Sequence, residues 1–237
     1  MAVVALVAAV GGLGVLLLAG PGSRMGWWSF RTGLGLLPWA AYGGIAGMAL
    51  GVVGLALGGL RVVALVAFLA GATAFVPPWT FRHTAQSVPP IHDISTDTDD
   101  PPRYVAVLAR REGASNPVEY GGPPVAAQQH RAYPDIRPLT LPDPPSRAFA
   151  RALAAARAQG WEIVAAEPAE GRIEATDTTR WFGFKDDIVI RVTPRGADSA
   201  VVDMRSKSRV GKSDVGANAA RIRTYLAALA RAAGGSP

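Results

Sequence analysis

Cationic side chains crowd one stretch of this sequence, from Arg205 to Arg223. Residues 205–231 contain seven Lys or Arg residues against one acid, Asp214. The stretch runs from an expected β-strand through a polar loop into an expected final helix, and the free amides of a helix's first turn favour an anion. It therefore predicts a site for an anionic group or a partner protein. The expected binding residues are Arg205, Arg209, Lys212, Ser213, Asp214 and Arg221.

Two other interpretations of this stretch stay open. The cations could instead pair with nearby acids and stiffen the junction, and the acids concerned are Asp186, Asp187, Asp203 and Asp214. A hydrolase or transferase could use Asp186, Asp187 and Ser213, and Glu174, Asp186 and Asp187 are secondary site candidates. Gly211-Lys212-Ser213 is similar to the end of a phosphate-binding loop, but Ser206 stands where that loop needs glycine. We therefore assign no catalytic residue.

The residue types that hold metals or cofactors are scarce or badly spaced. The chain has no cysteine, which excludes disulfides, thiolate catalysis and cysteine-based zinc sites. The three histidines, at positions 83, 92 and 130, are far apart in the sequence. An acidic cluster begins at Asp93, yet Pro102 and Leu108 occupy the positions where a calcium loop starting at Asp97 needs Gly and Glu. The sequence predicts no metal and no cofactor.

Three apolar segments near the N-terminus must position this chemistry at a membrane. Residues 2–20, 36–59 and 62–77 each approach the ~20 apolar residues that span a bilayer. No acid precedes Asp93, and no ionisable residue lies inside a span, which argues against a transporter or channel. Gly43, Gly47 and Gly51 recur every fourth residue in the second segment, a spacing that favours close packing among the three helices.

The remaining chain divides into a proline-rich arm, 83–145, and an α+β domain, 146–237. From residue 83 onward there are 20 basic and 18 acidic residues, and the basic ones are not interleaved with stacking aromatics, so we predict no nucleic-acid partner. Residues 146–159 predict a helix, four period-two stretches between 161 and 208 predict an antiparallel sheet, and 217–233 predict a closing helix. We expect a two-layer sandwich, with the polar face of its sheet either solvated or a binding surface.

Five stretches of the sequence are similar to a known family. In these stretches the chain resembles the bacterial and plastid family called domain of unknown function 1499, over about residues 90–231. Its three-helix start is similar to that of the family's longer members. The matching stretches are Pro90 to Asp97 with Asp100-Pro101-Pro102, Tyr133 to Ile136 with Pro138-Leu139, Ile173-Glu174-Ala175, Phe182 to Asp187, and Arg205 to Arg223.

The resemblance implies no established activity, so it assigns no catalytic residue. Many shorter members have an Asn-Cys-Val-Ser-like stretch where this chain has Ser115-Asn116-Pro117-Val118, which excludes a thiol role here. Several shorter members look exported. We therefore expect the C-terminal domain to be periplasmic, although Arg24 and Arg31 in the first loop, against Arg61 in the second, weakly favour the cytoplasm.

The sequence thus predicts a multi-pass protein of the bacterial inner membrane. Its expected role is a non-enzymatic binding or scaffold module of the cell envelope. Its expected partners are the lipid bilayer and an anionic ligand or an envelope protein. A hydrolase or transferase, and a structural subunit of a membrane complex, are the alternatives.

Overall fold

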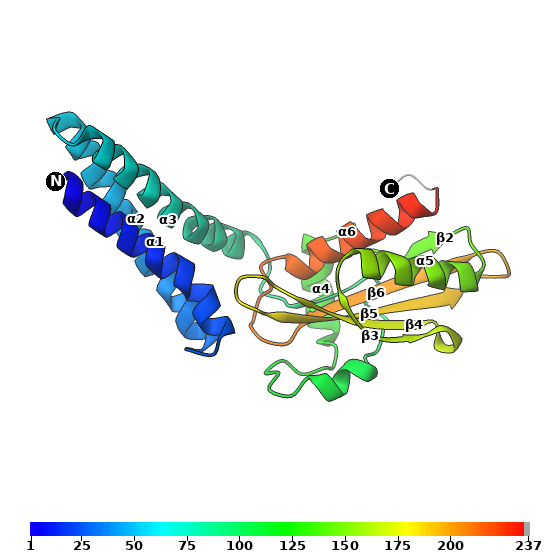
Figure 1. Ribbon diagram of the computed structural model, residues 1–237. Coiled ribbons are helices and arrows are strands. Elements are labelled where there is room, and N and C mark those ends of the chain that lie inside the picture. The colour runs from blue at the N-terminus through cyan, green and yellow to red at the C-terminus, as the bar shows by residue number, and fades with distance from the viewer. Residues whose placement is uncertain (235–237) are drawn as a thin grey trace. The chain divides into compact units, whose positions relative to one another are not determined.

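The computed structural model describes residues 1–234, which form two compact units. The first unit is Met1–Ser87 together with the short segment Thr179–Gly183. The second contains Val88–Thr178 and the described residues from Phe184 onward. The first unit contains three long helices, and Figure 1 shows a sheet with packed helices in the second. An apolar helical region followed by an α+β domain with an antiparallel sheet is confirmed.

The three helices of the first unit are each long and apolar enough to cross a membrane. They are α1 (Ala2–Arg24), α2 (Phe30–Leu57) and α3 (Arg61–Ser87). Helix α2 begins earlier than the apolar pattern indicates because Ser29 caps it, accepting a hydrogen bond from the Thr32 amide at 3.2 Å. Helix α3 continues through Pro77 and Pro78, so these two prolines remove backbone donors without ending the helix.

The glycine stripe of α2 packs within the chain, as its spacing predicted. A methyl group added at Gly47 would lie 2.6 Å from Cβ of Ala9 in α1. One added at Gly43 would lie 2.8 Å from Cα of Gly12, and one at Gly51 would lie 2.9 Å from the Ala64 oxygen in α3. Only a hydrogen fits at these positions, so the backbones of neighbouring helices approach closely.

The sheet of the second unit is antiparallel and has the strand order β1-β6-β5-β4-β3, with β2 also paired to β6. The four expected strands correspond to β3, β4, β5 and β6, and the expected count was too low because β1 and β2 come from the predicted arm. Each of these two has three residues, too short to show a period-two pattern. The strands are β1 (Asp93–Ser95), β2 (Leu139–Leu141), β3 (Glu162–Glu167), β4 (Arg172–Thr178), β5 (Lys185–Pro194) and β6 (Ala200–Ser208).

Two helices, α5 (Pro145–Ala158) and α6 (Ala217–Ala232), cover the apolar face of this sheet. Alternate strand residues such as Ile173, Ile190 and Met204 are fully buried beneath them. The rings of Trp161 and Tyr225 pack at 5.4 Å between centroids. The alternation of apolar and polar residues therefore predicted correctly which strand residues face the helices.

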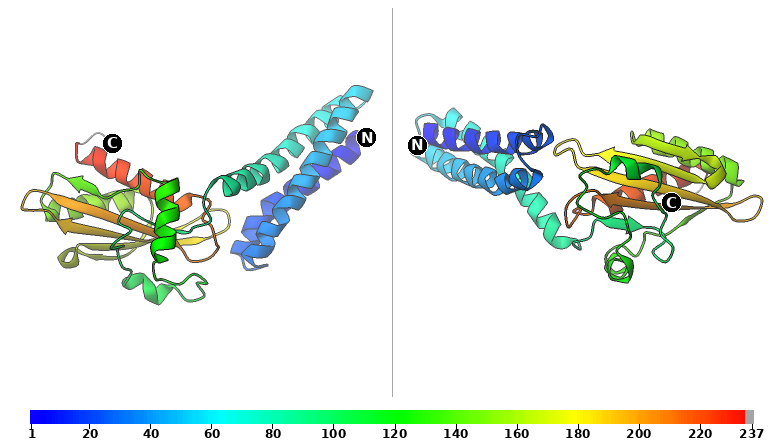
Figure 2. Two further views of the ribbon diagram at one scale, coloured as in Figure 1. Left: turned by 180° about the vertical axis from the view of Figure 1, so that it is seen from behind. Right: turned by 90° about the horizontal axis from the view of Figure 1, so that it is seen from below.

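The polar face of the sheet is not solvated, because the arm folds across it. The arm contains a short 3₁₀ helix, η1 (Ala106–Arg110), and α4 (Gly122–Ala132), and a second 3₁₀ turn, η2 (Pro168–Glu170), joins β3 to β4. Figure 2 shows the green arm segments lying over the sheet when the molecule is seen from below. Gln129 of α4 is fully buried and bonds to both the amide and the carbonyl of Ser95, at 3.0 and 2.6 Å. The arm thus adds cover on the face opposite the helices.

Candidate functional site

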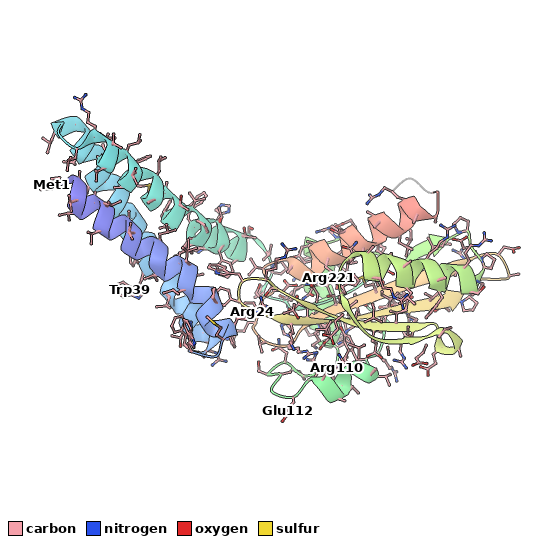
Figure 3. All side chains as sticks on the ribbon, in the orientation of Figure 1. Met1, Arg24, Trp39, Arg110, Glu112 and Arg221 are labelled. Atoms are coloured by element: carbon pink, nitrogen blue, oxygen red, sulfur yellow. The ribbon has the colours of Figure 1, made fainter. Side chains whose placement is uncertain are left out.

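The sheet separates the cations of the 205–223 stretch into two groups. Arg205 and Lys207 are alternate residues of β6, and Arg209 follows the strand at the same spacing, so these three side chains leave the sheet on the arm-covered face. Arg221 lies in the second turn of α6, on the helix-covered face. Figure 3 labels Arg221 on α6 and Arg110 on η1, on opposite sides of the sheet. These cations therefore do not form one continuous surface.

Asp93 of β1 neutralises two of these cations. Its carboxylate accepts hydrogen bonds from Arg205 Nε and Nη2, each at 2.8 Å, and from Lys207 Nζ at 2.8 Å. Lys207 stands directly opposite Asp93 in the β1–β6 register, which brings their side chains to the same place. The three side chains are 3%, 4% and 2% exposed for Asp93, Arg205 and Lys207. This cluster is therefore a buried ion triad, the Asp93 triad.

The arm completes the hydrogen bonding of the Asp93 triad. Arg205 Nη2 donates to the Val118 carbonyl at 2.8 Å, and Lys207 Nζ donates to the Glu119 carbonyl at 2.6 Å. The rings of Tyr104 and Tyr120 flank the Arg205 guanidinium, with centroids 4.9 and 5.4 Å from its central carbon. Burial lowers the pKa of Lys207, and the Asp93 carboxylate opposes that shift. Burial also raises the pKa of Tyr120 to about 12.

Asp187 of β5 holds a second pair of cations on the same face. Its carboxylate accepts hydrogen bonds from Arg209 Nη2 at 2.7 Å and from Thr176 Oγ1 at 3.0 Å, and it pairs with Arg111 Nη1. The Asp187 side chain is 0% exposed, and those of Arg111 and Arg209 are 7% and 10% exposed. Arg111 also donates to the Asn116 carbonyl at 2.8 Å, so this cluster fastens the arm to the sheet.

Arg221 is held in a similar way on the helix-covered face. Its Nη2 donates to Asp177 at 2.8 Å and to Asp186 at 2.7 Å. Its Nη1 donates to Asn218 Oδ1 at 2.5 Å and to Ser206 Oγ at 3.1 Å. The side chain is 8% exposed, so its charge serves contacts inside the domain.

The N-terminus of α6 already carries a carboxylate from the chain itself. Asp214 accepts hydrogen bonds from the amides of Gly216 and Asn218, at 2.8 and 3.0 Å, and burial raises its pKa. It therefore occupies the position where an external anion would meet the first-turn amides. Ser213 Oγ accepts a hydrogen bond from the Val215 amide at 3.1 Å, while Lys212 is exposed.

These contacts support internal pairing of the cations, the alternative that the sequence left open. Of the six predicted binding residues, Arg205, Arg209 and Arg221 are committed to buried carboxylates and Asp214 to backbone amides. Capture of an external anion at this junction stays a prediction. The hydrolase alternative requires Asp186 and Asp187 to act together, yet these consecutive strand residues point to opposite faces and pair with different arginines.

Glu174, a secondary candidate from the sequence, anchors η1. Its 0% exposed carboxylate accepts hydrogen bonds from the amides of Val105, Ala106 and Val107 at 2.9–3.1 Å, and it pairs with Arg172. A carboxylate with several amide donors is strongly held. Glu174 of β4 therefore satisfies the first amides of η1, as a capping residue does at the start of a helix.

Glu174→Gln should weaken the attachment of the arm. It replaces one carboxylate oxygen, which accepts hydrogen bonds from the η1 amides, with an NH₂ group that can only donate. Leaving one or two of these amides unsatisfied should lower the free energy of unfolding by about 2–4 kcal/mol. Hydrogen exchange read by mass spectrometry should rise at residues 105–107 first. Glu170→Gln is the matched control, since the Glu170 side chain is 60% exposed, and it should leave exchange there unchanged. Unaltered protection of residues 105–107 in Glu174→Gln would contradict this role.

An open hollow with both polar and apolar lining lies between two segments of the arm. Its volume is about 620 Å³, within the usual range of ligand pockets. Thr98 Oγ1 lies 3.0 Å from His130 Nε2 across it, joining the segment after β1 to α4. The lining residues of this arm hollow are Thr96, Asp97, Thr98, Asp99, His130, Pro134, Ile136, Arg137 and Pro138.

Several polar groups of the arm hollow have no partner within residues 1–234. The Arg137 guanidinium uses only its Nε, which donates to the Pro134 carbonyl at 3.1 Å. The Asp99 carboxylate is exposed and accepts no hydrogen bond from the described residues. The Asp97 carboxylate, in contrast, already has partners. It accepts hydrogen bonds from the amides of Asp99 and Asp100, and it pairs with Arg191. The lining of the hollow therefore includes free donors on Arg137 and a free acceptor on Asp99.

Thr98, His130 and Arg137 were not predicted from the sequence as site residues. Thr98 and His130 are 32 positions apart, and neither lies in a periodic element with the other. One signal was present: two stretches that carried the family resemblance, around Asp97 and Pro134, border the hollow. Within residues 1–234, no group of three or more His, Cys, Asp or Glu side chains could hold a metal ion.

Comparison with known protein families matches residues 93–229 to the model described as protein of unknown function, DUF1499. This match covers more than half of the chain. The chain belongs to the DUF1499 family. The Asp93 triad, the Asp187 cluster and the arm hollow all lie within the DUF1499 match. No curated protein matches the sequence.

Proposed function

We propose that this DUF1499 protein is a membrane-anchored, non-enzymatic binding module of the bacterial cell envelope. Its three apolar helices would lie in the inner membrane, and its second unit would bind a polar ligand on the periplasmic side. The observation that carries the proposal is the arm hollow, whose Arg137, Asp99 and His130 side chains retain hydrogen-bonding capacity while the larger charge clusters are paired internally.

The chemistry of the arm hollow favours a hydroxyl-rich ligand over a simple anion. Arg137 offers N–H donors and the Asp99 carboxylate offers an acceptor, so a group that both donates and accepts hydrogen bonds is complementary to the pair. Pro134, Ile136 and Pro138 supply an apolar surface against which a ring can lie. A sugar-type ligand has both properties, and the Asp99 carboxylate would repel an anion.

Binding of a sugar to the full chain in mild detergent tests this proposal. Isothermal titration with N-acetylglucosamine as the probe should give weak, saturable binding, and inorganic phosphate should give none. Arg137→Ala should weaken sugar binding roughly tenfold, equivalent to ~1.4 kcal/mol. Arg157→Ala, at an exposed position on α5, is the matched control and should bind as the wild type does. No binding of the sugar, or equal binding by Arg137→Ala, would contradict the proposal.

Three further measurements test the alternatives and the placement. Hydrolysis of an ester and phosphoester panel by the full chain, lost in Ser213→Ala, would favour the hydrolase. Ser213→Ala is a mild change because the hydroxyl accepts one local hydrogen bond, from the Val215 amide. A reporter that is active only in the periplasm should give a signal when it is fused to the C-terminus. A signal from a reporter that is active only in the cytoplasm would overturn the periplasmic placement. The structural-subunit alternative instead predicts stable co-purification with a complex that Arg137→Ala does not disturb.

A further inference from the structure

A cleft of about 500 Å³ lies between α2 and α3, inside the first unit. One wall is made by α2 and the other by α3, two antiparallel neighbours joined by a short turn. The residues on which its chemistry depends are Pro38, Ala41 and Tyr42 of α2 with Phe75, Trp79 and Arg82 of α3. This α2–α3 cleft is distinct from the arm hollow, which belongs to the second unit.

The cleft opens because close helix contact stops at a pair of glycines. A methyl group at Gly44 would lie 2.5 Å from the Gly71 oxygen, so the two backbones touch there. Beyond that point the glycines give way to larger residues, including Pro38 on α2 and Phe75 on α3, and these side chains cannot approach as closely. The result is a wedge, closed at the glycine contact and open toward the end of α3.

Polarity changes along the length of the α2–α3 cleft. Phe75 and Ile45 line its closed part, whereas Arg82 and Gln86 line its open part. At 1.5 Å per residue the α3 wall from Phe75 to Gln86 is about 16 Å long, roughly one leaflet of a ~30 Å hydrocarbon core. Trp79 lies one turn before Arg82, and an aromatic ring at that level is typical of the membrane–water interface. An amphiphile with one apolar chain and a polar head matches this gradient.

Arg82 has no acidic partner inside the first unit. Its side chain is exposed and has no carboxylate partner within residues 1–234. The first unit contains no Asp or Glu at all, because the first acid of the chain is Asp93 and the segment 179–183 has none. An arginine at this depth therefore has the phosphate of a lipid as its available counter-ion, and guanidinium and phosphate form strong paired hydrogen bonds.

We propose that the α2–α3 cleft is a lipid site that holds one acyl chain of an anionic phospholipid, with the lipid phosphate at Arg82. The acyl chain lies along Phe75 and Tyr42 toward the glycine contact. The headgroup lies beside Arg82 and Gln86, where the side-chain amide can donate to a phosphate oxygen. This site goes beyond the proposed binding function of the second unit. It does not depend on whether the arm hollow binds a ligand.

Native mass spectrometry of the full chain tests the site directly. The chain is released from bilayers of equal phosphatidylglycerol and phosphatidylcholine content, and the lipids that stay bound are identified. We expect one phosphatidylglycerol per chain to be retained in preference to phosphatidylcholine, because the choline ammonium of phosphatidylcholine offsets the phosphate charge that Arg82 would bind. Arg82→Gln should lower that retention roughly tenfold, equivalent to ~1.4 kcal/mol. Arg61→Gln, which removes an exposed arginine at the opposite end of α3, is the matched control and should retain the lipid.

A second variant tests the cleft itself. Ala41→Phe should fill part of the space and lower retention, while Val66→Phe, at a 48% exposed position outside the cleft, should not. Equal retention of the two lipids by the wild-type chain would overturn the proposal. Retention of phosphatidylglycerol by Arg82→Gln at the wild-type level would overturn it too, even if Ala41→Phe failed to fold.

Discussion

Asp93→Ala should destabilise the second unit more than the loss of any other carboxylate in its ion clusters. It removes the one carboxylate that faces both Arg205 and Lys207, which are 4% and 2% exposed. Leaving one buried charge without its partner typically costs ~3–5 kcal/mol, and this change leaves two. A domain of ordinary stability, with ~5–15 kcal/mol in all, would be close to unfolding. Urea titration of the full chain in mild detergent, followed by circular dichroism, measures the loss.

Two controls show whether charge burial causes the loss. Asp198→Ala removes an exposed acid from the β5–β6 turn and should change the free energy of unfolding by less than ~0.5 kcal/mol. The triple replacement of Asp93 by Ala with Arg205 and Lys207 by Met should recover much of the stability, because it leaves no buried charge unpaired. A free energy of unfolding in Asp93→Ala equal to that of the wild type would instead show that the burial of Arg205 and Lys207 does not depend on this carboxylate.

Asp187→Asn should have the second-largest effect and should act on the arm first. The substitution keeps the size of the side chain but removes the charge that faces Arg209 and Arg111. We expect a loss of about 3–5 kcal/mol, since both guanidinium groups are largely buried. Hydrogen exchange should rise at residues 110–116, because Arg111 links Asp187 to the Asn116 carbonyl. Exchange mass spectrometry with urea titration measures both effects.

Asp135→Asn is the matched control for this second change. Asp135 pairs with Arg223 through two hydrogen bonds, at 2.5 and 2.7 Å, but the side chains of Asp135 and Arg223 are 53% and 44% exposed. An exposed pair contributes ~0–1 kcal/mol, so this loss should be small. If Asp187→Asn and Asp135→Asn had equal effects, burial of the Asp187 cluster would not be what stabilises the arm.

The outcome at Asp93 and Asp187 also decides how the cationic stretch should be understood. Both acids lie on the arm-covered face. Asp93 pairs with Arg205 and Lys207, and Asp187 pairs with Arg209. A fold that depends on both carboxylates explains the crowding of arginines without any ligand. A ligand would then bind at the arm hollow, which has unpaired polar groups, or at the α2–α3 cleft, which has open volume.

The sequence by itself determined the three long apolar helices, the order of the main elements and the faces of the strands. Uninterrupted apolar segments are sufficient for the first, because about 20 consecutive apolar residues are typical of a helix long enough to cross a bilayer. The period-two alternation determined that Ile188 and Ile190 face a core while Asp187 and Arg191 face away. The glycine spacing of α2 determined its tightly packed face, since only small residues allow such contact.

Only the tertiary structure decided what the polar face meets. Asp93 and Arg205 are 112 positions apart, and Arg111 and Asp187 are 76 apart. Periodicity reports which side of a strand a residue occupies, but a solvated charge and a buried, paired charge give the same alternation. The covering arm has strands of three residues and short helices, so no periodic pattern in the sequence predicted that it covers the sheet. Whether the cations of the 205–223 stretch face solvent or an internal carboxylate depends on contacts between segments distant in sequence, and local patterns do not encode those.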